Sequence, residues 1–100
     1  ESLKLKKDDL ILVDAGVKYK RYCSDRTCTS VADFDNFNFE RKQTFKNKKH
    51  QKIYDIVLKA QEKSIKEARA GMKACDVDKI ARDFISPSFT ILSFELPLKL

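Results

Sequence analysis

One hundred residues make one small domain, which buries about 60–70% of the surface that its unfolded chain exposes. The composition, with 42% hydrophobic and 36% charged residues, is typical of a soluble globular protein and excludes collagen, mucin-like stalks and coiled-coil arrays. The net charge of +6 is local, because residues 41–73 carry eleven Lys and Arg against three Asp and Glu.

The sequence carries no signal for membrane insertion or secretion. It has no run of about 18 apolar residues, and its charged start lacks the apolar core of a signal peptide. The three cysteines, Cys23, Cys28 and Cys75, are too few for a secreted disulfide framework. We therefore expect reduced thiols, a cytoplasmic location and no membrane contact. Because the first residue is not Met, we also expect a piece of a longer protein.

The first half of the chain predicts an antiparallel hairpin. The apolar run at residues 10–13 is typical of a strand buried on both faces, and β-branched, aromatic and Thr residues over 17–31 predict its partner. The turn should lie near Tyr19 and Lys20, and since neither residue favours a positive φ, we expect a longer or bulged loop. Residues 33–40 mix Asp and Asn with three Phe, which predicts an irregular loop anchored by aromatic rings.

The second half predicts two helices. Apolar residues recur at helical spacing over residues 48–70, with Asp55–Lys59 and Glu62–Lys66 as four-apart ion pairs. A second apolar stripe predicts a helix over residues 74–85, and the short connection between them predicts antiparallel packing.

The ends of these helices have their own signals. Gly71 is expected to cap the first helix, and Pro87 is expected to stop the second. Residues 89–100 partly alternate apolar and polar side chains, which predicts an exposed or edge strand. The fold class is therefore α+β, an antiparallel β-hairpin followed by two antiparallel helices.

Two aspartates are the informative pair. If the turn is centred between Tyr19 and Lys20, Asp14 and Asp25 lie directly opposite each other, with Cβ atoms about 4.5–5.5 Å apart. Facing carboxylates repel unless one takes a proton or a cation lies between them, and a hard divalent metal is the obvious cation. The alternative is two solvent-exposed aspartates, or a register shifted by a bulge.

Other candidate sites are weaker. The basic run at residues 41–52 could contact phosphates, but only Phe45 interrupts it, so we expect an ordinary solvated surface and no nucleic-acid partner. His50 is expected to be a surface residue. Cys23 and Cys28 fit no zinc spacing, and two glycines exclude a phosphate-binding glycine loop.

Several ordered motifs resemble one family. The segments Val13-Asp14-Ala15-Gly16 and Tyr22-Cys23-Ser24-Asp25, with their aspartates eleven residues apart, resemble the paired-aspartate signature of the pita-bread metallopeptidases, in particular the Xaa-Pro aminopeptidase and dipeptidase branch. Residues 51–61, Gly71 and residues 77–82 resemble the two helices that follow in that family. The resemblance covers roughly residues 5–85.

This resemblance implies a dinuclear site that hydrolyses peptide bonds next to proline. Asp14 and Asp25 would be the first two metal ligands, and Asp25 matches the one that bridges or lies closest to both ions. Paired divalent cations lower the pKa of a shared water and polarise the scissile carbonyl. Manganese is the expected ion, and cobalt, zinc or iron are also admitted.

The chain departs from the family pattern after Ile85. The glycine-rich histidine segment and the two later glutamates of the family are absent, and Cys28 stands where the family often has Arg. We therefore divide the chain into residues 1–85, a partial catalytic domain, and 86–100, a tail that does not match and looks like a truncation or frameshift. No catalytic or other cofactor-binding residue is assigned.

Three hypotheses follow. The first is a fragment of an Xaa-Pro metallopeptidase that is inactive alone. Its parent enzyme would act on peptides and contain the missing remainder of the catalytic domain. The parent is also a candidate homodimer. The second is a non-catalytic pita-bread-like module that binds an acidic partner through its basic helix region. The third is the non-functional product of a broken gene.

Overall fold

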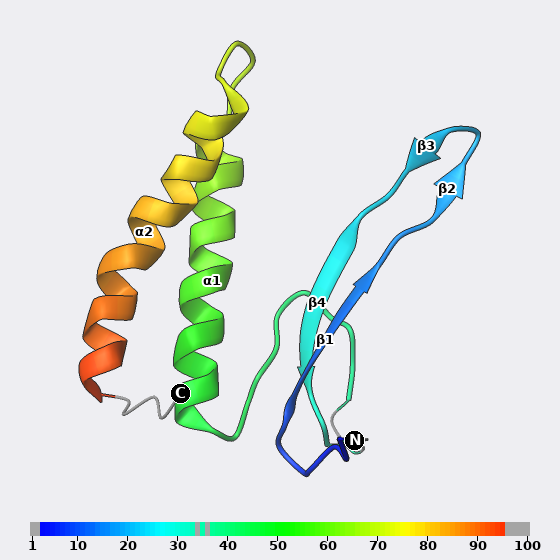
Figure 1. The fold of residues 1–100 in the computed structure, drawn as a ribbon, viewed down its shortest axis with the longest axis vertical. Helices are drawn as coiled ribbons and strands as arrows, with labels where there is room; N and C mark the ends of the chain where they lie inside the picture. Colours follow the sequence, from blue (N-terminus) through cyan, green and yellow to red (C-terminus); the bar gives the residue numbers. More distant parts are fainter. Residues whose placement is uncertain (1–2, 34, 36, 96–100) are drawn as a thin grey trace. The chain divides into compact units, whose positions relative to one another are not determined.

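The computed structural model describes residues 3–33, 35 and 37–95, in two units, Glu1–Lys48 and Lys49–Leu100. The first unit holds four short strands and the second holds two helices, which confirms the α+β class (Figure 1). In chain order the elements are β1 (Leu10–Ala15), β2 (Lys18–Tyr19), β3 (Tyr22–Cys23), β4 (Arg26–Val31), α1 (Lys48–Glu67) and α2 (Ala74–Glu95).

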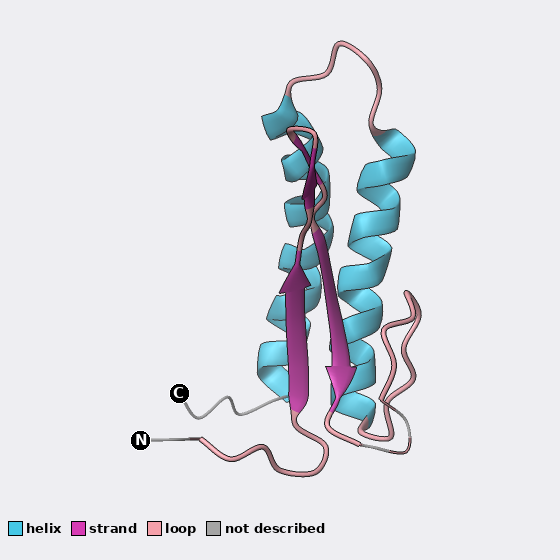
Figure 2. Ribbon diagram, turned by 90° about the vertical axis from the view of Figure 1, so that its right-hand side faces the viewer, coloured by secondary structure: helices cyan, strands magenta, loops and turns pink. Residues whose placement is uncertain are grey.

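The strands form one long antiparallel hairpin. β1 pairs with β4 and β2 pairs with β3, and β2 and β3 lie at the tip (Figures 1 and 2). Both pairs keep the same register, from Leu10 opposite Val31 at the base to Tyr19 opposite Tyr22 beside the turn. The expected hairpin over residues 10–31 is therefore present.

The turn lies one residue later than expected. Lys20 and Arg21 form a tight two-residue turn, with φ values of 46° and 72°. This left-handed geometry matches the twist of the flanking strands, although Asn and Gly usually supply it. The prediction of a turn at Tyr19 and Lys20 with a longer loop was wrong, because the two tyrosines pair across the strands and leave Lys20 and Arg21 to reverse the chain.

β1 is also less buried than its apolar run suggested. Leu10 and Leu12 point to one face and are 42% and 65% exposed, whereas Ile11 and Val13 on the other face are half-buried. The prediction of burial on both faces was wrong, because an antiparallel pair of strands can leave one face uncovered.

The connection from β4 to α1 is irregular, as expected. The rings of Phe37 and Phe39 meet edge to face with centroids 4.8 Å apart, and Arg26 Nη2 donates to the Phe39 carbonyl over 2.7 Å. The buried side chain of Gln43 holds the loop together, since its Nε2 donates to Asn38 Oδ1 at 2.6 Å and to the Glu40 carbonyl at 2.8 Å. Phe34, the third ring of the prediction, lies outside the described residues.

The two helices lie side by side and antiparallel (Figures 1 and 2). The predicted stripe of α1 centres on Ala60, which is 1% exposed, and the predicted α2 stripe is half-buried at Val77, Ile80, Ala81 and Phe84. In α1, Lys63 forms an ion pair with Glu67, and Asp55 accepts a hydrogen bond from Gln51. Neither interaction was among the expected pairs.

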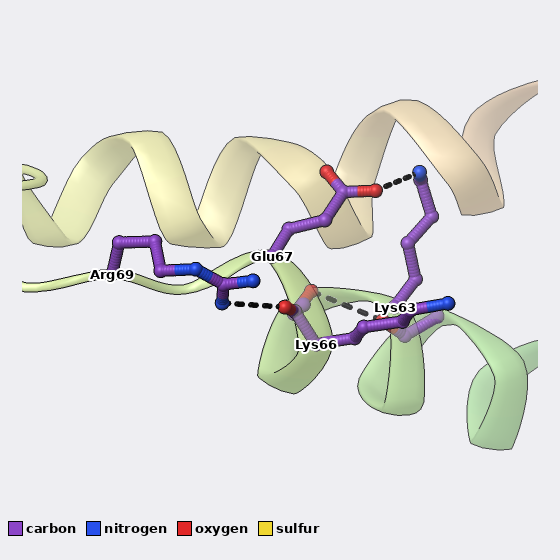
Figure 3. A network of polar contacts seen from close by, with 6 residues as sticks. Lys63, Lys66, Glu67 and Arg69 are labelled. Atoms are coloured by element: carbon purple, nitrogen blue, oxygen red, sulfur yellow. Dashed lines mark hydrogen bonds and ion pairs between the residues drawn. The ribbon is translucent and has the colours of Figure 1, made fainter.

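The first helix ends at Glu67, before the expected glycine cap. Arg69 Nη1 donates to the carbonyls of Lys66 and Ala68 over 2.6 and 2.7 Å, which satisfies oxygens that the helix end leaves unpaired (Figure 3). Gly71, with φ of 90°, lies in the following turn and supplies its left-handed residue. The prediction that Gly71 caps the helix was therefore wrong.

The second helix does not stop at Pro87. α2 continues through it to Glu95, so both the expected end at Ile85 and a strand over residues 89–95 were wrong, and residues 96–100 lie outside the described part. Proline removes one backbone hydrogen bond and strains the preceding turn. The hydroxyl of the next residue, Ser88, donates a hydrogen bond to the Phe84 carbonyl over 3.3 Å. This bond gives a backbone oxygen near the proline an additional partner.

Candidate metal centre

Asp14 lies near the end of β1, opposite Thr27 and not opposite Asp25. The expected direct pairing of the two aspartates was wrong. The cause is the turn: because its centre moves by one residue, the cross-strand partner of Asp14 moves by two, from Asp25 to Thr27.

A shift of two residues keeps the face of the sheet unchanged. Asp25 directly precedes β4, and with the side-chain alternation of that strand extended by one residue it falls on the same side as Asp14. The two aspartates are then diagonal neighbours, a relation in which residues lie about 7–8 Å apart. Both side chains are exposed. This spacing leaves room between the carboxylates for a cation.

The backbone around Asp25 depends on a glycine. A Cβ atom on Gly16 would lie 2.4 Å from the Ser24 carbonyl oxygen, so a larger residue could not allow this close approach. Two hydrogen bonds keep the strands together here: Ser24 N donates to the Val17 carbonyl over 2.9 Å, and Val17 N donates to Ser24 Oγ over 3.1 Å. Gly16 therefore positions the segment that carries Asp25.

The hydroxyl of Thr27 is the polar group that reaches Asp14. Thr27 Oγ1 donates to Asp14 Oδ1 over 3.0 Å. The sequence analysis assigned no role to Thr27 or to the close approach at Gly16. The turn position is the signal that could have found Thr27. With the turn at Lys20 and Arg21, Thr27 is the residue directly opposite Asp14.

The donor set fits half of a site for a hard divalent cation. Carboxylate oxygens are among the ligands that manganese and magnesium prefer. Among the described residues, no group of three or more His, Cys, Asp or Glu side chains is placed to hold a metal ion. Any further His, Cys, Asp or Glu ligand of a cation held by Asp14 and Asp25 would therefore come from outside the described residues.

Of the other candidates, Cys23 and Cys28 lie close to Asp25 along the chain, and His50 follows 25 residues after it. His50 is half-buried in the first turn of α1, and the three cysteines are free thiols. In the basic run, Lys46 Nζ lies 3.6 Å from the buried carboxylate of Asp33. None of the helices in the described residues is long and apolar enough to cross a membrane.

Two side chains of α2 have raised pKa values. A hydrogen bond to Asp83 raises the pKa of Lys79, and a hydrogen bond to Asp78 raises the pKa of Arg82. Both are four-apart pairs on the exposed side of α2. Four-apart pairs of this kind support the helix.

Comparison with known proteins identifies relatives of much greater length. The chain is 45% identical over 83 residues to an uncharacterized peptidase of Staphylococcus haemolyticus, and 43% identical over 82 residues to one of Staphylococcus epidermidis. It is 35% identical over 83 residues to a Xaa-Pro dipeptidase of Pyrococcus horikoshii. These alignments cover 82–83% of this chain but about 20% of each relative.

No solved structure matches the chain at a significant level. The family model of metallopeptidase family M24 matches residues 1–95, which is nearly the whole chain. This match includes the hairpin with its two aspartates and both helices. The chain therefore belongs to metallopeptidase family M24, a family of metal-dependent hydrolases.

Proposed function

We propose that the chain is part of a metallopeptidase that cleaves peptide bonds next to proline, and that Asp14 and Asp25 are two of its metal ligands. The observation that carries this proposal is the placement of two exposed carboxylates on one face of the hairpin, at diagonal positions. The Xaa-Pro dipeptidase relatives, 35% identical, support the choice of substrate.

The roles of the two residues follow from their charge and position. Asp14 and Asp25 would attract a divalent cation and hold it midway along the hairpin, where β1 and β4 lead into β2 and β3. A pair of such cations, manganese in our proposal, would lower the pKa of a bound water and polarise the scissile carbonyl. The carboxylates otherwise repel each other, so occupation by a cation also stabilises this face.

Two carboxylates do not complete such a site. A hard cation takes about six or more oxygen ligands, so we propose that this chain alone is inactive and depends on further residues of a longer protein. The chain spans about a fifth of its curated relatives. We propose a proline-containing peptide as substrate, the rest of the catalytic domain as partner, a homodimeric parent and a cytoplasmic location. The division at Ile85 likewise stays a prediction.

The test is isothermal titration of the 100-residue chain with Mn²⁺. We expect binding in the micromolar range, abolished in the double variant Asp14→Asn/Asp25→Asn. The matched control is Asp8→Asn/Asp76→Asn, which removes the same charge from two other exposed positions and should bind as the wild type does. Equal binding by the aspartate pair variant, or no binding by the wild type, would contradict the assignment of these ligands to this chain.

A further inference from the structure

The two aspartates of the candidate centre differ in how they are held. Asp14 accepts a hydrogen bond from the hydroxyl of its cross-strand partner, Thr27, over 3.0 Å. Among the described residues, no hydrogen-bond donor reaches the carboxylate of Asp25. One ligand is thus oriented by the sheet itself, and the other can turn freely.

The geometry of this contact suits the orientation of a metal ligand. Residues directly opposite on antiparallel strands have side chains close enough to touch, and the branched Cβ of threonine restricts its own rotamers. The hydroxyl occupies one lone pair of Asp14 Oδ1, so the remaining lone pairs of both oxygens are available to a cation. Thr27 can therefore fix the rotamer of Asp14 without blocking it.

We propose that Thr27 is a positioning residue for the metal centre: its hydroxyl holds the Asp14 carboxylate in the orientation in which it receives the cation. This inference rests on the proposed function, since it takes Asp14 to be a ligand. Groups that orient metal ligands in this way change metal affinity by about 10–100-fold when they are removed.

The alternative is that the contact only stabilises the hairpin. A cross-strand pair of this kind contributes to strand pairing whatever Asp14 does. The two roles differ in their measurable consequences. A purely structural contact changes the unfolding midpoint, whereas a positioning contact also changes the Asp14 rotamer and the metal affinity of the folded chain.

The first experiment measures the Asp14 rotamer without metal. Three-bond Hα–Hβ couplings of Asp14 are recorded by NMR in the wild type, Thr27→Val and Thr27→Ser. We expect a single rotamer in the wild type and in Thr27→Ser, which keeps the hydroxyl, and averaged couplings in Thr27→Val, which has nearly the same shape without it. Unchanged amide shifts over β1 and β4 would verify that each variant folds.

The second experiment measures Mn²⁺ affinity of the same chains by calorimetry. Thr27→Val should bind at least about 10-fold more weakly than the wild type, and Thr27→Ser should recover most of the loss. Thr29→Val is the matched control, because it removes a hydroxyl from the same strand and face, opposite Leu12, where no carboxylate of the described residues accepts it.

Each outcome decides one of the two proposals. A single Asp14 rotamer in Thr27→Val, or Mn²⁺ affinity equal to that of the wild type, overturns the positioning role of Thr27. Absence of Mn²⁺ binding by the wild type overturns the proposed function for this chain, and the coupling measurement then decides whether Thr27 orients Asp14. Equal losses in Thr27→Val and Thr29→Val would assign the effect to the sheet and also overturn the inference.

Discussion

At the scale of single residues, Ser30 is a buried polar residue in β4. Its side chain is 1% exposed, and its hydroxyl makes no hydrogen bond among the described residues. A buried hydroxyl that has lost its water and gained no partner costs about 1–3 kcal/mol.

We therefore expect Ser30→Ala to raise the free energy of unfolding by about 1 kcal/mol. Urea unfolding followed by circular dichroism gives this value. Ser24→Ala is the control: it removes a hydroxyl that accepts the Val17 N–H, so it should lower stability slightly. Destabilisation by Ser30→Ala would mean that the hydroxyl has a partner that the described contacts do not include.

At the scale of elements, the hairpin turn carries a strain that its residue types do not relieve. Lys20 and Arg21 both adopt positive φ, which costs L-residues with a Cβ about 1–2 kcal/mol each. Asn and Gly adopt this conformation far more readily. The strand pairing on either side maintains the turn against this cost.

The double variant Lys20→Asn/Arg21→Gly should accordingly increase the free energy of unfolding by about 1–2 kcal/mol. Urea unfolding of the hairpin, read from the NMR intensities of β1 and β4, measures the change. Lys18→Asn, placed in regular strand geometry, should give no gain. A turn variant no more stable than the wild type would show that the left-handed conformation is not strained in this hairpin.

The helical elements show where local signals mislead. Helical spacing predicted a helix over residues 48–70, and α1 ends three residues earlier, at Glu67. The prediction was close because an amphipathic pattern over 20 residues is a strong signal. Pro87 was expected to end α2, yet the helix continues for eight residues beyond it. A single proline destabilises a helix by about 3 kcal/mol. The stabilisation from the helical turns that follow Pro87 can offset this cost.

At the scale of the whole molecule, the chain buries little apolar surface. Val31, Phe45 and Ala60 are the buried apolar residues of the described part. Larger apolar side chains remain exposed on both units, among them Leu12, Tyr19, Tyr22 and Ile65 at 62–84%. Exposed apolar groups of this extent favour association with other surfaces.

We expect a free energy of unfolding below about 5 kcal/mol for the isolated chain, which is the lower end for natural domains. Equilibrium urea unfolding measures it, and binding of the dye ANS would report the exposed apolar surface. Adding NaCl should promote association, seen by light scattering, because salt screens the repulsion due to the net charge of +6. A steep transition above that value without ANS binding would contradict this expectation.

The sequence by itself determined the hairpin, the presence of two helices and the family. Periods of 2 and 3.6 residues distinguish strands from helices, and the eleven-residue spacing of Asp14 and Asp25 placed both on one hairpin. Their shared face also followed, because an even shift of register leaves side chains on the same side.

Only the tertiary structure decided which residues meet. The pairing of Tyr19 with Tyr22 moved the turn and brought Thr27, not Asp25, opposite Asp14. The bond between Thr27 and Asp14 and the close approach at Gly16 then follow from that register. Local preferences cannot supply this information, since a register depends on the summed energies of contacts between residues distant in the chain.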